Sequence, residues 1–146
     1  MTGRVLKLYR TKDDKDKTRE SCTQLELDYN GVLGDKFYAK DPQRAILITS
    51  IESYKLAHSN GIELDEGALG ENILIDINPY HLLPGERFSI GESVLEITQN
   101  CTLCKGLSRV HNKLPKLLKN DRGIFAKIVN DDENKVSLHD HVELEW

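Results

Sequence analysis

Short apolar segments separated by turn residues constrain the fold of this chain more than any other feature of its sequence. Residues 25–29 alternate apolar and polar side chains and end at Asn30-Gly31, a dipeptide that favours a tight turn. Gly91-Glu92 likewise separates two such segments, which predicts a hairpin. The predicted strands are 4–9, 25–29, 45–48, 72–77, 87–90 and 93–99. Many short strands with few helices indicate a mostly β fold, a barrel or sandwich that carries small helices.

Helices and a last strand pair complete the predicted order. Thr49 and Glu52 match a capping box, which predicts a helix from there to about His58, with Gly61 just beyond its end. Apolar residues at helical spacing follow between 107 and 117, and Pro115 is expected to divide them into two short helices. The segments 123–129 and 136–144 are predicted to pair around the polar loop 131–134.

Length and composition limit the classes of protein to which the chain can belong. Its 146 residues fit one domain, 1–146, with a core of its own. A net charge of −4 speaks against general binding of nucleic acid, and a mean hydropathy of −0.49 indicates a soluble protein. No apolar stretch approaches the roughly 18 residues of a membrane span, and the first residues lack the pattern of a signal peptide. Three cysteines cannot all pair within one chain, so a reducing cytoplasm is the expected location.

Cys101 and Cys104 open a basic stretch within this acidic chain. Between 105 and 127 the only acidic residue is Asp121, and the basic residues are Lys105, Arg109, Lys113, Lys116, Lys119, Arg122 and Lys127. Fixed positive charge favours the thiolate, which is the form of cysteine that attacks electrophiles and binds metals. The stretch therefore predicts a site for a ligand that is both thiophilic and anionic. Taken alone, it is also compatible with a zinc half-site, a redox dithiol, packed thiols or a solvated basic face. Cys22, beside the charged loop, is interpreted as incidental, and the scattered histidines are interpreted as structural.

Short motifs follow one another along the chain in a fixed order. The motifs are Gly31-Val32-Leu33-Gly34-Asp35, Arg44 before an apolar strand, Gly67-Ala68-Leu69-Gly70-Glu71-Asn72, Leu83-Pro84-Gly85-Glu86-Arg87-Phe88-Ser89-Ile90-Gly91, Cys101 to Cys104, and Arg122-Gly123-Ile124-Phe125-Ala126. This series resembles the MOSC domain family (molybdenum cofactor sulfurase C-terminal domain), and the resemblance runs from about Gly3 to Leu144. Each motif is short, and their specificity lies in their order and in the cysteine that follows the hairpin.

The resemblance implies a MOSC-type β-barrel that binds the pterin-based molybdenum cofactor (molybdopterin) through a cysteine thiolate. It also implies an activity of some standalone members, the reduction of N-hydroxylated compounds, with electrons from a separate reductase. The alternative from another class is a non-redox carrier that passes the cofactor, or a persulfide sulfur, to a receiving enzyme. A dithiol or zinc protein without the cofactor remains the third interpretation.

The candidate site residues follow from these motifs. Cys104 is predicted as the metal ligand and catalytic residue, because its position after the hairpin matches the family and Lys105 adjoins it. An additional Cys101 stands upstream, and Leu103 occupies a position where many members have proline. The predicted cofactor-binding residues are Gly34, Asp35, Lys36, Arg44, Gly70, Glu71, Asn72, Cys101 and Arg122, aided by helix N-termini near Thr49 and Pro115. As alternatives, Asp35 could cap a turn, Arg44 could pair with a surface carboxylate, and Glu71 and Asn72 could serve their own turn.

Overall fold

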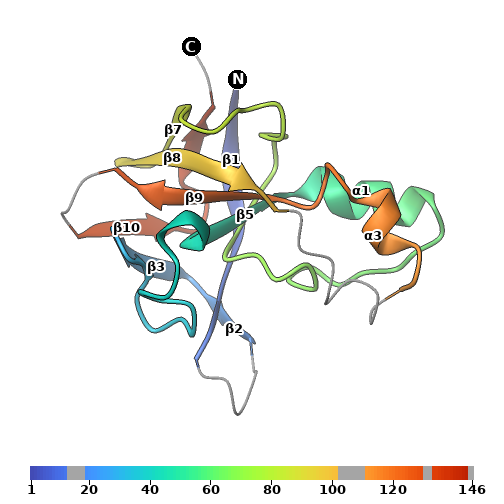
Figure 1. The fold of residues 1–146 in the computed structure, drawn as a ribbon, viewed down its shortest axis with the longest axis horizontal. Helices are drawn as coiled ribbons and strands as arrows, with labels where there is room; N and C mark the ends of the chain where they lie inside the picture. Colours follow the sequence, from blue (N-terminus) through green and yellow to red (C-terminus); the bar gives the residue numbers. More distant parts are fainter. Residues whose placement is uncertain (13–18, 102–110, 130–132, 145–146) are drawn as a thin grey trace.

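Strands account for most of the regular secondary structure in the described part of the chain. The computed structural model describes residues 1–12, 19–101, 111–129 and 133–144 (Figure 1). The strands are β1 (Thr2–Thr11), β2 (Arg19–Cys22), β3 (Gln24–Asp28), β4 (Gly31–Val32), β5 (Ile46–Ser50), β6 (Ile73–Ile75), β7 (Arg87–Ile90), β8 (Ser93–Asn100), β9 (Ile124–Ile128), β10 (Asn134–Ser137) and β11 (His141–Glu143). The helical segments are the 3-10 turn η1 (Pro42–Arg44), α1 (Ile51–Ser59) and α3 (Leu114–Leu117).

Seven strands close into a barrel in the order β11-β7-β8-β9-β5-β6-β1, because β11 also pairs with β1. The long strand β1 makes this closure possible. Its first residues pair with β11, as in Thr2 opposite Glu143, and its last residues pair with β2, as in Thr11 opposite Arg19. A smaller sheet, β10-β3-β4, completes the fold. The mostly β barrel predicted from the sequence is confirmed, as are the β7–β8 hairpin and the strands around Asn30-Gly31.

The helix α1 connects β5 to β6, which pair in parallel. A parallel pair requires such a crossover, because a tight turn can join only antiparallel strands. The helix ends as the sequence predicts: Gly61 has a φ of +76°, its N–H donates to the carbonyl of His58, and the N–H of Ile62 donates to that of Ala57. These two bonds form a Schellman motif. Its start differs from the prediction, since Ser50 rather than Thr49 is the N-cap. The hydroxyl of Thr49 instead donates to the carbonyl of Arg122 at 2.9 Å.

Replacing Ser50 with alanine is expected to lower the free energy of unfolding by about 1 kcal/mol. The Ser50 hydroxyl accepts the N–H of Glu52 at 3.1 Å, and that donor has no intrahelical partner once the cap is lost. Urea unfolding followed by circular dichroism measures the change. Ser59→Ala at the exposed end of α1 is the control, with a smaller expected loss. Equal stability of Ser50→Ala and the parent would contradict this cap.

The predicted pairing of 123–129 with 136–144 is wrong. Both edges of β9 are occupied, since Ala126 lies opposite Ile46 of β5 on one side and Ile97 of β8 on the other. The second segment is also not one strand, because a turn with His139 at a φ of +71° separates β10 from β11. Consequently β10 pairs with β3, whereas β11 pairs with β1 and β7.

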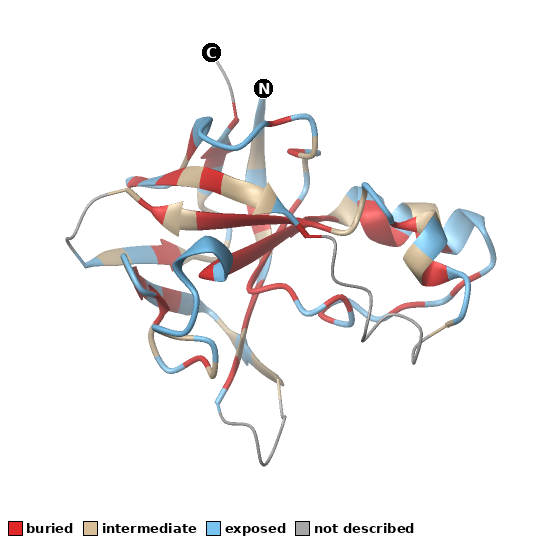
Figure 2. Cartoon of the chain, viewed as in Figure 1, coloured by how far each residue is buried: buried red, intermediate tan, exposed pale blue. Residues whose placement is uncertain are grey.

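Two large apolar clusters form the core, and Figure 2 shows buried residues both in the barrel and in the helices beside it. The larger fills the barrel and includes the fully buried Phe88 and Ile48. The smaller joins α1 and α3, with Tyr54 packed near Leu114 beside the barrel. Pro115 lies in the first turn of α3, where its missing N–H costs nothing, so it starts the second of the two predicted helices. Most of the segment predicted for the first helix lies outside the described residues. Among the described helices, none combines the length and apolar character needed to cross a membrane.

Candidate functional site

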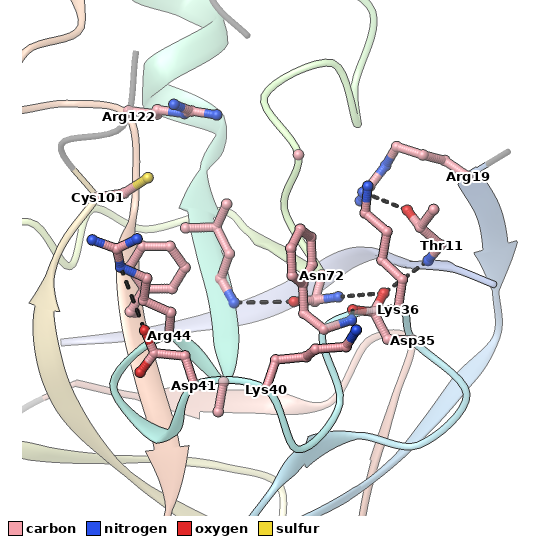
Figure 3. A pocket seen from close by; sticks show the side chains of 15 residues that line it. Thr11, Arg19, Asp35, Lys36, Lys40, Asp41, Arg44, Asn72, Cys101 and Arg122 are labelled. Carbon is pink, nitrogen blue, oxygen red and sulfur yellow. Dashed lines mark hydrogen bonds and ion pairs between the residues drawn. The ribbon is translucent and has the colours of Figure 1, made fainter. Parts of the chain in front are cut away.

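A pocket of about 420 Å³ opens at one end of the barrel, where several loops converge (Figure 3). The walls come from the ends of β1 and β2, the loop from 35 to 41, η1, the start of β5, the loop before β6, and the facing ends of β8 and β9. The lining residues are Thr11, Arg19, Asp35, Lys36, Phe37, Lys40, Asp41, Arg44, Ala45, Leu47, Gly70, Asn72, Cys101, Arg122 and Phe125.

The pocket is strongly cationic within an acidic protein. Five of its lining side chains are basic and two are carboxylates. One carboxylate, Asp41, faces Arg44 with 3.9 Å between Oδ2 and Nε, and both side chains are about half exposed. Such an exposed pair is weak, so Arg44 can exchange this partner for an anionic ligand at little cost. The surplus of positive charge suits a ligand that carries several negative charges.

The side chains of Asp35 and Asn72 stabilise the pocket wall through hydrogen bonds to the backbone. Asp35 Oδ1 accepts the N–H of Thr11 at 2.8 Å, and its Oδ2 accepts the N–H of Phe37 at 3.1 Å. Asn72 Oδ1 accepts the N–H of Leu47 at 3.0 Å, while Nδ2 donates to the carbonyl of Tyr9 at 3.2 Å. Both side chains line the pocket, but their polar atoms are committed to the backbone. Asp35 therefore supports its own turn, as the alternative interpretation expected. Asn72 connects β1 to β5 through its side-chain hydrogen bonds.

Replacing Asn72 with alanine is expected to lower the free energy of unfolding by about 3 kcal/mol, because a buried N–H and a buried carbonyl each lose their partner. The change is measured by urea unfolding, with the exposed Asn120→Ala as the matched control. A loss as small as that of the control would show that the bonds to Leu47 and Tyr9 contribute little.

Arg122 is held in place at both its backbone and its side chain. Its carbonyl accepts the hydroxyls of Thr49 at 2.9 Å and Tyr80 at 3.3 Å, and its Nη2 donates to the carbonyl of Leu69 at 3.2 Å. Gly123 allows this close approach, since a Cβ there would lie 2.9 Å from the carbonyl oxygen of Ile48. The Nε and Nη1 atoms of Arg122 are buried without a hydrogen-bond partner among the described residues. Such unpaired charged donors are costly unless a ligand accepts them.

Arg19 is a second fixed guanidinium that the sequence interpretation missed. Its Nη1 donates to the hydroxyl of Thr11 at 3.2 Å, its Nη2 donates to the carbonyl of Glu71, and its Cζ lies 5.3 Å above the ring of Tyr9. Within the described part of the chain, its buried Nε has no partner. The sequence places Arg19 in a charge run that reads as an exposed loop. The pairing of β2 with the end of β1 brings Arg19 to the pocket, and no local sequence motif predicts that pairing.

Several predicted site residues lie elsewhere. Gly34 is outside the pocket, where a Cβ would lie 2.8 Å from Nη1 of Arg10, so its lack of a side chain accommodates this arginine instead of a ligand. Glu71 is fully buried behind the pocket, with Oε2 accepting the hydroxyl of Tyr54 at 2.6 Å. Neither Ser50, at the N-terminus of α1, nor any residue of α3 lines the pocket, which corrects the predicted contribution of helix N-termini.

Of the two cysteines predicted for the site, Cys101 lies within the described residues. Cys101 is 3% exposed and lines the pocket beside Leu47 and Phe125. Cys104 and Lys105 lie outside the described residues. Of the basic stretch from 105 to 127, Arg122 is the member in the described ranges that reaches the pocket. In those same ranges, no three or more His, Cys, Asp and Glu side chains gather in a way that would hold a metal ion.

Comparison with known proteins decides the family. The family model for the MOSC domain matches residues 17–143. The chain belongs to the MOSC domain family. Among solved structures, YuaD from Bacillus subtilis is similar with a TM-score of 0.81 and 20% identity, covering 98% of this chain and 95% of that one. No curated protein sequence matches the chain significantly.

Two further structures support the MOSC fold. YiiM from Escherichia coli has a TM-score of 0.71 at 22% identity, over 100% of this chain and 70% of its own. YiiM from Geobacillus stearothermophilus has the same TM-score at 14% identity, over 99% and 75% of the two chains. At these identities the likeness establishes the fold. The family itself is associated with the molybdenum cofactor, which carries a phosphate and oxo groups. Buried guanidinium donors without partners, a cationic lining and the apolar Leu47 and Phe125 fit a flat, anionic group of this kind.

Proposed function

We propose that the pocket binds the molybdenum–pterin cofactor, with the thiolate of Cys104 as the ligand of the metal. The observation that carries this proposal is the pair of fixed guanidinium groups, Arg19 and Arg122, each of which has at least one buried nitrogen without a partner within the described residues. Charge-assisted hydrogen bonds to an anion are among the strongest that proteins make. A multiply charged anionic ligand therefore gains most in this pocket.

Different residues of the pocket bind different parts of the proposed ligand. Arg19, Arg44 and Arg122 bind anionic groups, while Leu47 and Phe125 pack against a planar ring and exclude water. Lys36 and Lys40, at the pocket mouth, add positive charge that attracts an anion from solution. Lys105 beside Cys104 favours the thiolate, a soft ligand suited to a metal already bound by sulfur.

The proposed activity is the reduction of N-hydroxylated compounds. When bound, the cofactor supplies the redox chemistry that removes an oxygen atom from the substrate, and a separate reductase supplies the electrons. The second candidate is a carrier of the cofactor or of a persulfide sulfur, which the buried thiol of Cys101 beside the anion site favours. Either role suits a reducing cytoplasm, which keeps both thiols available.

Molybdenum and pterin analysis of the protein purified from a cofactor-producing host tests the proposal. We expect both in near-stoichiometric amounts. Absence of both, with zinc present in their place, would overturn the proposal in favour of a dithiol or zinc protein. Turnover of an N-hydroxylated compound with an artificial electron donor then separates the reductase from the carrier.

A further inference from the structure

The loop from Gly67 to Glu71 holds both guanidinium groups of the pocket. The carbonyl of Leu69 accepts Nη2 of Arg122 at 3.2 Å, and the carbonyl of Glu71 accepts Nη2 of Arg19. Figure 3 shows the two side chains entering from opposite sides of the pocket, with their guanidinium groups pointing toward one another. One short segment of backbone thus fixes the position of both cationic groups.

A buried pair of side chains, Tyr54 and Glu71, in turn fixes this loop. The hydroxyl of Tyr54 accepts the N–H groups of Gly67 at 2.9 Å and Leu69 at 3.3 Å, and it donates to Glu71 Oε2 at 2.6 Å. The same oxygen of Glu71 also accepts the N–H of Gly67, at 3.2 Å. Tyr54 is 2% exposed and Glu71 is 0% exposed, so solvent does not replace these bonds.

The buried carboxyl group of Glu71 carries a cost that the fold alone does not require. Burial raises the pKa of Glu71 above its ordinary value, and the second oxygen, Oε1, has no hydrogen-bond partner among the described residues. An apolar side chain would avoid the unpaired Oε1 but would leave the buried hydroxyl of Tyr54 without its acceptor. A glutamate at this position is explained if its hydrogen bonds are needed to hold the 67–71 loop in one conformation.

Packing couples the same loop to the face of Arg19. Gly67 has a φ of +94°, and a Cβ there would lie 3.1 Å from Cζ of the Tyr9 ring. That ring lies under the guanidinium of Arg19. The loop therefore positions Arg19 through a carbonyl and also through the ring of Tyr9.

We propose that Glu71 and Tyr54 are positioning residues for anion binding, acting through the 67–71 loop on Arg19 and Arg122. The ligand class that this arrangement selects is an anion with acceptor atoms for two separate guanidinium groups, such as a diphosphate. The inference rests on the proposed function, because it concerns the same pocket. It adds that the orientation of the two arginines, and not their charge alone, sets the affinity.

Calorimetric titration of the full chain with inorganic pyrophosphate tests this inference. Glu71→Leu removes the acceptor and Tyr54→Phe removes the hydroxyl, so we expect each to bind pyrophosphate about tenfold more weakly. Glu71→Gln keeps an oxygen that accepts from Tyr54 and Gly67, and we expect affinity within about threefold of the parent. Glu92→Leu, at the exposed turn between β7 and β8, is the matched control with unchanged affinity.

A spectroscopic signature separates positioning from a general loss of stability. The Nε–Hε signals of Arg19 and Arg122, assigned with Arg19→Lys and Arg122→Lys, should shift when pyrophosphate is added to the parent protein. In folded Tyr54→Phe they should shift less at the same concentration. Thermal midpoints of all variants are measured in parallel, and Tyr54→Phe decides the test if Glu71→Leu does not fold.

The outcomes distinguish the two proposals. A parent protein that does not bind pyrophosphate would overturn the anion site itself, and with it the proposed function. A parent that binds, with Glu71→Leu and Tyr54→Phe binding equally well, would overturn only the positioning role. Affinity lost equally in Glu71→Gln and Glu71→Leu would also overturn that role, because the acceptor oxygen that glutamine retains would then make no difference.

Discussion

Replacing Cys104 with serine is expected to reduce the molybdenum content of the purified protein from near-stoichiometric to background. A serine hydroxyl is a hard ligand that stays protonated at neutral pH, whereas a cysteine thiolate is a soft ligand that binds soft metals. Loss of the thiolate therefore removes the covalent link between the proposed cofactor and the chain. Metal analysis of the purified variant measures the loss.

Two other cysteines of the chain provide matched controls. Cys22 lies on β2, outside the pocket, and Cys22→Ser should retain the metal in full. Cys101→Ser should retain most of it, because Cys101 is assigned to the pocket wall. Molybdenum that disappears with Cys101→Ser and persists with Cys104→Ser would transfer the ligand role to Cys101.

Replacing Arg122 with methionine is expected to weaken pyrophosphate binding by about a hundredfold. Two buried donors of this guanidinium lack partners in the described part of the chain, and each charge-assisted bond to an anion contributes about 1.5 kcal/mol or more. Together these bonds correspond to about two orders of magnitude in the dissociation constant. Methionine retains much of the side-chain volume, so the packing near Leu69 is disturbed little. Calorimetric titration measures the change.

The control for this prediction is Arg87→Met on β7. Arg87 is largely exposed, pairs with Glu96 at 3.2 Å and lies outside the pocket. Its replacement changes the net charge by the same amount, so it separates the local effect from the general field of the protein. Equal weakening of binding by both substitutions would show that Arg122 acts only through long-range charge.

Local patterns predict many of the strands because strands such as β3 and β7 bury alternate residues, whereas β5 and β6 are continuous apolar segments. Asn30-Gly31 and Gly91-Glu92 do connect neighbouring strands, and the apolar segment before Thr49 becomes the buried strand β5. The error at the C-terminal segments has a non-local origin. Strands β5 and β8 occupy both edges of β9, so the nearest segment in sequence has no place to pair.

The pocket was only partly predictable for the same reason. The resemblance to the MOSC family assigns Lys36, Arg44 and Arg122 to one site, although they are far apart in sequence. All three line the pocket. The roles of Asp35 and Asn72 required coordinates, because a carboxylate or amide bound to backbone looks the same in sequence as one that awaits a ligand. Arg19 depends on a pairing between β1 and β2 across a charged segment, which carries no apolar pattern.

The closure of the barrel by β11 has a consequence for the order of folding. Thr2 lies opposite Glu143, and Ile90 of β7 pairs with Val142, so the last described strand fills a gap between two strands made much earlier. Contacts between such distant residues form late, since their loop entropy must first be overcome. While the chain is being synthesised on the ribosome, β1 and β7 therefore keep open edges until residues 141–143 emerge. During that interval the two open edges are sites at which another chain can pair, so the nascent chain is prone to aggregation.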